Sequence, residues 1–194
     1  MKTKFILMFT LMFTLMSCFE NKTFLSDEEK KWNPYKKGQT LVFESSEGKL
    51  DSIHIKDVRS QFPDGLGVKE YYEVLNVVGL SEDPKWSKKV EEDILSIQAK
   101  TKKRDSRLKF CLSIKTAKFY YSGYYLFNDK LIRKTKKNFT TPYKEFKNIT
   151  IIESPDNFFE VKNAIKFLYW NNEVGYVGFE KFDGVSWKLK EVLK

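Results

Sequence analysis

Hydrophobic and polar residues alternate along most of the chain beyond residue 38, which is the pattern of β-strands that bury one face. The clearest run covers residues 107–116, where one face carries Leu108, Phe110, Leu112 and Ile114. Residues 39–45 and 50–59 alternate on either side of Gly48, so they predict a hairpin with this glycine at positive φ. Further strands are predicted over residues 68–78, 94–101, 119–127, 146–153 and 164–170.

The last hairpin turns at Gly184, and its register follows from the positions of its apolar residues. A two-residue loop would place Trp187 opposite Glu180, whereas a three-residue loop places Trp187 opposite Phe179. Only the second gathers the apolar side chains on one face, because a slip of one residue turns every side chain over. We therefore predict a Phe179–Trp187 pair, with Gly184 in a left-handed bulge conformation.

Two short helices are predicted among the strands. Ser26 and Glu29 have the spacing of a capping box, and a helix there would end before Pro34. The segment 81–84 offers a second cap with proline in the first turn, followed by apolar residues at helical spacing. We expect that second helix to give way to a strand by about Ile94.

These elements predict a mainly β fold, with one domain of about nine or ten mostly antiparallel strands and one or two short helices. Few helical segments are long enough to cross over between parallel strands, which favours antiparallel pairing. Several strands are apolar on both faces. This favours a strongly curved sheet, a sandwich or a barrel-like form.

The first eighteen residues do not follow the β pattern. Lys2 and Lys4 precede an apolar run over residues 5–16, which is typical of an export signal. A helix of that run would reach roughly 18 Å, less than the ~30 Å hydrocarbon core of a bilayer. An ordinary signal peptidase cut before Cys18 needs small residues at the first and third preceding positions, and Leu15 is too large.

The sequence Leu15-Met16-Ser17-Cys18 resembles the lipobox of bacterial lipoproteins. The resemblance implies transfer of diacylglycerol to the Cys18 thiol, removal of residues 1–17 as a signal peptide, and acylation, for example with palmitate, of the new amine. Two or three acyl chains would anchor the protein stably in a membrane. We expect residues 18–35 to form a lipid-anchored tether and residues 36–194 to form the globular domain. An uncleaved or soluble N-terminus with an ordinary Cys18 thiol is the alternative.

Three further segments are similar to small, largely uncharacterised lipoproteins of flavobacteria and their relatives. They are Trp32-Asn33-Pro34-Tyr35-Lys36-Lys37-Gly38-Gln39, Tyr143-Lys144-Glu145-Phe146-Lys147-Asn148-Ile149, and Tyr176-Val177-Gly178-Phe179-Glu180 with Asp183, Gly184 and Trp187. The resemblance implies an outer-membrane lipoprotein, on the periplasmic face or at the cell surface. Several lysines near the predicted anchor would favour an anionic membrane surface, and a solvated linker is the alternative: Lys22, Lys30, Lys31, Lys36 and Lys37.

The amino-acid composition of the chain limits the classes of partner that we expect. The chain has 35 basic and 26 acidic residues, a formal net charge of +9, and removal of residues 1–17 takes away two lysines and no acid. Arginine is rare among the basic residues, whereas specific recognition of nucleic acids relies on its bidentate geometry. We therefore expect no nucleic-acid partner. Cys111 is the only cysteine besides Cys18, so an intramolecular disulfide framework is not expected.

The candidate catalytic residues are isolated from one another. His54 is the only histidine, which excludes a multi-histidine metal site. Ser52 is its neighbour on one strand face, roughly 6–7 Å away, so the two do not form a catalytic triad unaided. Cys111 lies between two apolar residues of a predicted strand, with no base nearby in sequence. We expect no catalytic residue, no metal and no cofactor.

Residues 119–127 are the most aromatic stretch of the chain. Cross-strand packing is the favoured interpretation. The functional interpretation is an exposed patch in which Tyr121, Tyr124 and Tyr125 contact an anionic or glycan-like ligand or partner.

Three classes of function remain open. The favoured one is a non-catalytic, lipid-anchored module that binds an unknown envelope protein or ligand. The second is a periplasmic half-barrel that handles lipids, which would need a large apolar cavity. The third is a hydrolase of the envelope, which would need polar groups converging in a cleft.

Overall fold

The computed structural model describes residues 22–63, 70–83, 88–114, 116–125, 132–134, 138–154 and 163–194, and all their side chains except those of residues 82, 83, 88, 118–125 and 132–134. Within this part, the principal sheet has eleven strands in the order β8-β7-β6-β5-β3-β2-β15-β14-β13-β12-β9, and each neighbouring pair is antiparallel. The predicted mainly β, mostly antiparallel fold is confirmed. Of the three forms left open by the sequence, the strongly curved sheet is the one present, and it has eleven strands.

The strands of the sheet, in that spatial order, are β8 (Ala117–Tyr125), β7 (Arg107–Ile114), β6 (Lys88–Gln98), β5 (Val74–Asp83), β3 (Leu50–Gln61), β2 (Thr40–Ser45), β15 (Ser186–Leu193), β14 (Gly175–Lys181), β13 (Ile165–Asn171), β12 (Thr150–Glu153) and β9 (Ile132–Lys134). Two small pairs lie beside it: β1 (Lys22–Thr23) runs parallel to β4 (Tyr71–Tyr72), and β10 (Phe139–Thr140) pairs with β11 (Glu145–Phe146). Helix α2 covers Asp27–Lys30.

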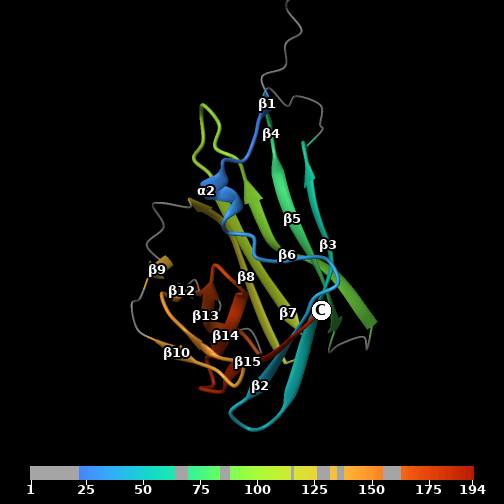
Figure 1. Ribbon diagram of the computed structural model, residues 1–194, viewed down its shortest axis with the longest axis vertical. Coiled ribbons are helices and arrows are strands. Elements are labelled where there is room, and N and C mark those ends of the chain that lie inside the picture. Colours follow the sequence, from blue (N-terminus) through green and yellow to red (C-terminus); the bar gives the residue numbers. More distant parts are fainter. Residues whose placement is uncertain are drawn as a thin grey trace, which may run out of the picture.

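The sheet curls so that its two halves face each other. The long strands β3 and β5–β8 form one wall, and β12–β15 turn across its lower part (Figure 1). The rings of Phe110 on β7 and Trp170 on β13 are 5.2 Å apart between centroids. The hydroxyl of Tyr176 on β14 donates a hydrogen bond to the carbonyl oxygen of Ile94 on β6, at 2.5 Å. The space between these strands is therefore filled by aromatic side chains.

The chain before β2 belongs to this core. Leu25, Trp32 and Tyr35 are buried, and Trp32 packs against Phe110 and Trp170 with ring centroids 6.3 and 6.5 Å apart. The backbone N–H of Tyr176 donates to the hydroxyl oxygen of Tyr35 at 2.9 Å. Residues 22–35 are thus part of the folded body and not the tether expected from the sequence, because their apolar side chains cover the inside of the sheet.

One of the two predicted helices is present. Ser26 caps α2 and forms the complete capping box with Glu29. The helix predicted from residue 81 is wrong for the described residues, since Ser81 lies in β5 opposite Val90 of β6. Pairing between two long strands satisfies far more backbone groups than a short helix would, so it overrides the local capping signal. Residues 84–87 of that prediction lie outside the described residues.

The predicted hairpins agree with the structure. Phe179 lies opposite Trp187 with their rings stacked at 5.7 Å, and Gly184 has φ +84°. Gly48 has φ +78° in the turn between β2 and β3. The apolar face predicted over residues 107–116 is completely buried. The strand predicted over residues 146–153 is divided into β11 and β12.

Candidate functional site

Strand β3 separates two ends of the molecule. Its last residue, Gln61, lies opposite Val74, which follows β4 and therefore lies close to β1. Its first residue, Leu50, follows the turn from β2, and the strand is 12 residues long, roughly 40 Å at about 3.3 Å per residue. We call the first the β1 end and the second the hairpin end. They lie at opposite extremes of the molecule (Figure 1).

A groove of about 720 Å³ lies on the half of β3 that is nearer to the hairpin end. Four strands, β2, β3, β5 and β6, supply its lining: Val42, Leu50, Asp51, Ser52, His54, Leu80, Ser81 and Lys89. Most of these side chains come from the outer face of the sheet, because Ile53 and Ile55, which alternate with Ser52 and His54, are buried inside. The groove is thus separate from the aromatic interior.

His54 is held in this groove by a neighbouring strand. Its Nδ1 lies 3.0 Å from Oγ1 of Thr40, its cross-strand partner on β2. Leu80 on β5 lies opposite His54 on its other side, so the imidazole stands between a hydroxyl and an apolar residue. The lining also contains the carboxylate of Asp51 and exposed Lys89, so it combines apolar side chains with hydrogen-bonding groups and charges of both signs.

The rim of the groove is braced from inside the sheet. Asp51 accepts hydrogen bonds from the backbone N–H of Thr116 at 2.9 Å and from its hydroxyl at 2.6 Å. Ser81 donates from its hydroxyl to the carbonyl of Ser113. These contacts tie β3 and β5 to the far end of β7, across the interior of the sheet.

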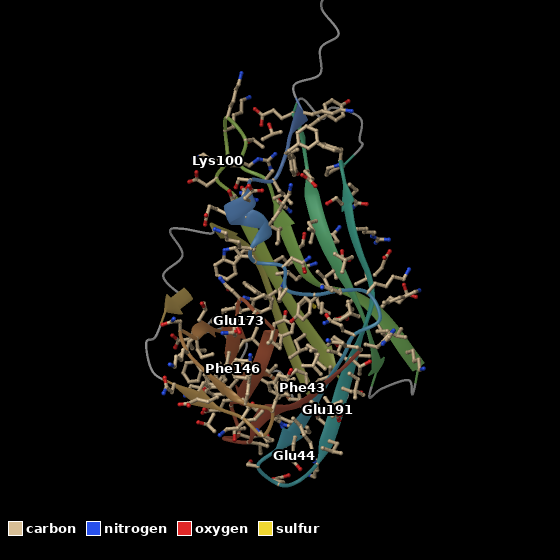
Figure 2. All side chains as sticks on the ribbon, in the orientation of Figure 1. Phe43, Glu44, Lys100, Phe146, Glu173 and Glu191 are labelled. Atoms are coloured by element: carbon tan, nitrogen blue, oxygen red, sulfur yellow. The ribbon has the colours of Figure 1, made fainter. Side chains whose placement is uncertain are left out.

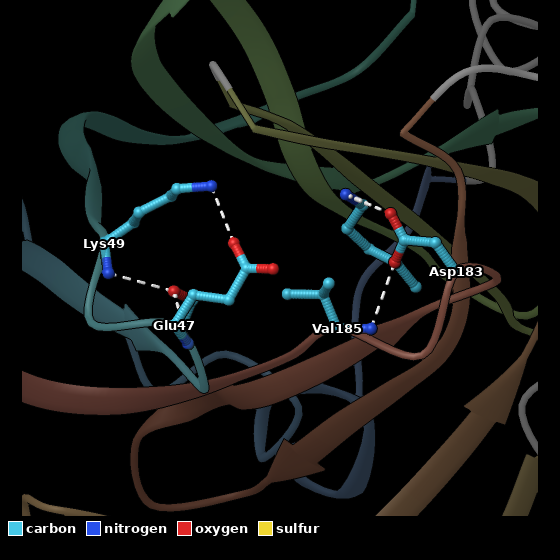
Figure 3. A network of polar contacts seen from close by, with 6 residues as sticks. Glu47, Lys49, Asp183 and Val185 are labelled. Carbon is cyan, nitrogen blue, oxygen red and sulfur yellow. Dashed lines mark hydrogen bonds and ion pairs between the residues drawn. The ribbon is translucent and has the colours of Figure 1, made fainter.

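The hairpin end is closed by two turns that lie side by side (Figure 3). The backbone N–H of Ser46 donates to the carbonyl of Ser186 at 2.8 Å and joins the turn after β2 to β15. Each turn carries its own ion pair: Lys49 with Glu47 at 2.6 Å, and Lys181 with Asp183 at 2.7 Å. Asp183 also accepts from the backbone N–H of Val185, which fixes its turn.

The two candidate nucleophilic or basic groups lie apart. Cys111 is on β7 and His54 is on β3, and strands β6 and β5 separate them. The two side chains have different partners: His54 contacts Thr40, and Cys111 donates to Glu92. The described contacts therefore bring no His–Cys pair together.

The Cys111 thiol is not activated. It lies 3.3 Å from Oε2 of Glu92 and donates to this carboxylate. Burial and the nearby Glu92 carboxylate raise the pKa of Cys111 to about 12, so the thiol is protonated at neutral pH. A protonated thiol is a poor nucleophile.

Of the other predicted site residues, Cys18 lies outside the described chain, and three tyrosines are described by their backbone alone. Cys18 precedes the described chain, so its lipidation stays a prediction. Tyr121, Tyr124 and Tyr125 lie on the edge strand β8, where their backbones pair with β7, but their side chains are not among those described. Their contact with a ligand also stays a prediction. Sequence reasoning missed Leu80 and Lys89 in the groove, because the segment that holds them was assigned partly to a helix.

Two further findings concern metal ligands and membrane spans among the described residues. No group of three or more His, Cys, Asp and Glu side chains in the described ranges is placed to hold a metal ion. Of the helical residues described, none belongs to a helix with the length and apolarity needed to span a bilayer. Comparisons with protein-family models, with curated proteins and with solved structures find no match for this chain.

Proposed function

We propose that this protein is a lipid-anchored component of the bacterial envelope, in which lipid on Cys18 holds a non-catalytic binding module at the membrane, on the outer membrane as the lipoprotein resemblance implies. The single observation that carries the proposal is how close to Cys18 the first described strand lies along the chain. Lys22 is already paired in β1, four positions after Cys18, and the segment that follows packs on the core through Leu25, Trp32 and Tyr35. An anchor at Cys18 would therefore hold the body directly, without a long linker.

The position of the groove supports the binding role. It lies toward the hairpin end, so an anchor next to β1 would leave its opening away from the bilayer. Its lining of apolar side chains with Asp51 and Lys89 suits an amphipathic ligand or a segment of a partner protein. The isolated His54 and the protonated thiol of Cys111 support a binding role over catalysis.

The anchor is tested by the substitution Cys18→Ala in the native host. We expect wild-type protein to partition with membranes and to yield an N-terminal peptide that begins at residue 18 and carries acyl mass. The variant should lack the acyl mass and retain residues 1–17, because the lipid acceptor of the lipobox is gone.

The matched control is Cys111→Ala, which removes the other cysteine. It should be lipidated and cleaved like the wild type. A Cys18→Ala protein with the N-terminal mass and membrane partition of the wild type would refute the anchor.

A further inference from the structure

Several side chains that the sequence separates widely meet at the β1 end. Lys22 Nζ lies 5.5 Å from the ring centroid of Phe62, and the rings of Phe24 and Phe62 meet edge to face at 5.3 Å. The guanidinium of Arg104 lies 5.5 Å from the ring centroid of Tyr72, whose partner in β1 is Thr23. The turn between β6 and β7 is thereby placed beside the first described residues of the chain.

Exposed cations gather at this end: Lys22, Lys102, Lys103 and Arg104. Of the acids nearby, Asp105 is paired with Lys100 at 3.2 Å, Glu73 is buried and accepts from the backbone N–H of Leu25, and Glu70 is half-buried. Helix α2 adds two exposed acids, Asp27 and Glu28, of which Glu28 is paired with Lys31. Lys100 lies next to α2 in this region, far from Glu44 toward the hairpin end (Figure 2).

An aromatic side chain projects from the same end. Phe24 is 63% exposed although the residues on either side of it are part-buried or buried. A large exposed apolar ring framed by cations matches the interfacial zone of a bilayer, where apolar rings lie at the level of the headgroups and cations contact anionic lipid.

We propose that the β1 end, formed by Lys22, Phe24, Phe62 and the Lys102–Arg104 turn, is a docking surface for an anionic phospholipid bilayer. The proposal rests on the lipid anchor at Cys18 and adds an orientation to it. Four residues of extended chain reach at most about 14 Å, so the anchor restricts Lys22 to the immediate vicinity of the headgroups. The cations then bind the lipid surface, and the groove points outward.

The lysines that the sequence suggested for this role are divided by the fold. Lys36 and Lys37 lie part-way along β3. Lys37 Nζ lies 3.9 Å from a carboxylate oxygen of Asp57, and the backbone N–H of Gly38 donates to the carbonyl of Ile55. Lys102 and Lys103, which are distant in sequence from the anchor, lie at the β1 end instead. This difference supplies a matched control, because both pairs are adjacent exposed lysines.

The test uses mature lipidated protein in vesicles of phosphatidylcholine, with or without phosphatidylglycerol. A spin label at Gln61→Cys reports on the β1 end, and a label at Glu47→Cys reports on the hairpin end; both positions are exposed, whereas Cys111 is buried. Collision rates with oxygen and with a water-soluble nickel chelate measure depth in the bilayer. We expect the label at residue 61 to approach lipid only when phosphatidylglycerol is present, and the label at residue 47 to stay in water.

The pair K102E/K103E should lower the ratio of docked to undocked protein by more than about tenfold, while K36E/K37E leaves it nearly unchanged. High salt should mimic the first pair, since it screens exposed charges. Circular dichroism melts confirm that each variant is folded.

The acyl mass of the N-terminal peptide, measured on the same samples, separates the two proposals. Its absence would refute the anchor. A lipidated protein whose label at residue 61 is as water-exposed as the label at residue 47 would overturn the docking surface alone. Equal effects of the two lysine pairs would overturn it as well.

Discussion

Glu29 is a carboxylate buried to 4% exposure between two distant parts of the chain. One oxygen accepts from the backbone N–H of Ser26 at 2.6 Å and from its hydroxyl at 2.8 Å. The other accepts from the backbone N–H of Lys100 at 3.0 Å and from the hydroxyl of Ser106. Burial raises the pKa of Glu29, but the hydrogen bonds from Ser106, Ser26 and Lys100 outweigh it and leave this pKa below its usual value.

Replacing Glu29 by Gln should lower the free energy of unfolding by about 1–3 kcal/mol at pH 7. The side-chain NH2 of Gln would face N–H and O–H groups that now donate to a carboxylate oxygen, so these hydrogen bonds would be lost. A lowered folded-state pKa stabilises the protein above the unfolded-state pKa, about 4.3, and this contribution is lost as pH falls through the folded-state pKa. The difference between wild type and variant should therefore shrink below about pH 4. Urea unfolding at several pH values measures it.

The control for this prediction is Glu28→Gln, since Glu28 is exposed and pairs with exposed Lys31. Such surface pairs contribute little, so we expect a change within about 0.5 kcal/mol. A Glu29→Gln difference that is constant from neutral to acidic pH would contradict the role of the buried charge.

At the scale of elements, the segment from β1 to Tyr35 behaves as a part of the core. It covers the inner face of the sheet through Leu25, Trp32 and Tyr35. Gly175 lies against Tyr35, where a larger residue would clash. A Cβ at Gly175 would lie 2.1 Å from the Tyr35 hydroxyl oxygen, and φ is +89° there. The segment therefore fits a surface that the C-terminal strands have shaped for it.

Trp32→Ala should destabilise the protein by about 3–5 kcal/mol, because it leaves a cavity between Phe110 and Trp170. Phe24→Ala in the same segment should change stability by less than about 1 kcal/mol, since Phe24 is largely exposed. Thermal and urea unfolding measure both. Equal, small effects of the two substitutions would restore the tether interpretation.

At the scale of the whole molecule, one hydroxyl group joins the two facing halves of the sheet. The β-bulge between Val77 and Val78 leaves Ile94 without a register partner on β5. The Tyr176 hydroxyl, from β14, supplies a donor to the Ile94 carbonyl at 2.5 Å and lies 3.3 Å from the carbonyl of Cys111. The carbonyl of Ile94, at the bulge in one wall, thus receives its hydrogen bond from Tyr176 in the opposite wall.

Tyr176→Phe should reduce the free energy of unfolding by about 1–3 kcal/mol, because a buried carbonyl loses its donor. Hydrogen exchange should accelerate in β6 and β14 together. The matched control is Tyr169→Phe, whose half-buried hydroxyl donates to Glu180 at 3.3 Å and should contribute less than about 1 kcal/mol. Faster exchange confined to β14 would show that the hydroxyl does not join the walls.

The elements that sequence predicted well are those specified by neighbours in the chain. The hairpin around Gly48, the Phe179–Trp187 register and the capping box of Ser26 depend on residues a few positions apart. The helix predicted from Ser81 failed because its cap signal is equally local, whereas the outcome depended on pairing between β5 and β6 over their whole length.

The groove could be predicted only in part. His54 and Ser52 were recognised as neighbours on one strand face, which the structure confirms. Leu80 and Lys89 join them only because β5 and β6 lie in a particular register beside β3. No pattern along the chain contains that register.

The sequence by itself determined the mainly β class, the antiparallel hairpins and the buried faces of the strands, because alternation and turn residues act over short distances. It also contains the lipobox-like stretch on which the proposed anchor depends. Only the tertiary structure decided that the sheet curls onto its own aromatic core, that residues 22–35 enter this core, and that Lys102 and Lys103 lie beside β1. These are long-range results of packing, in which the burial of Trp32 and Trp170 outweighs what each segment would do alone.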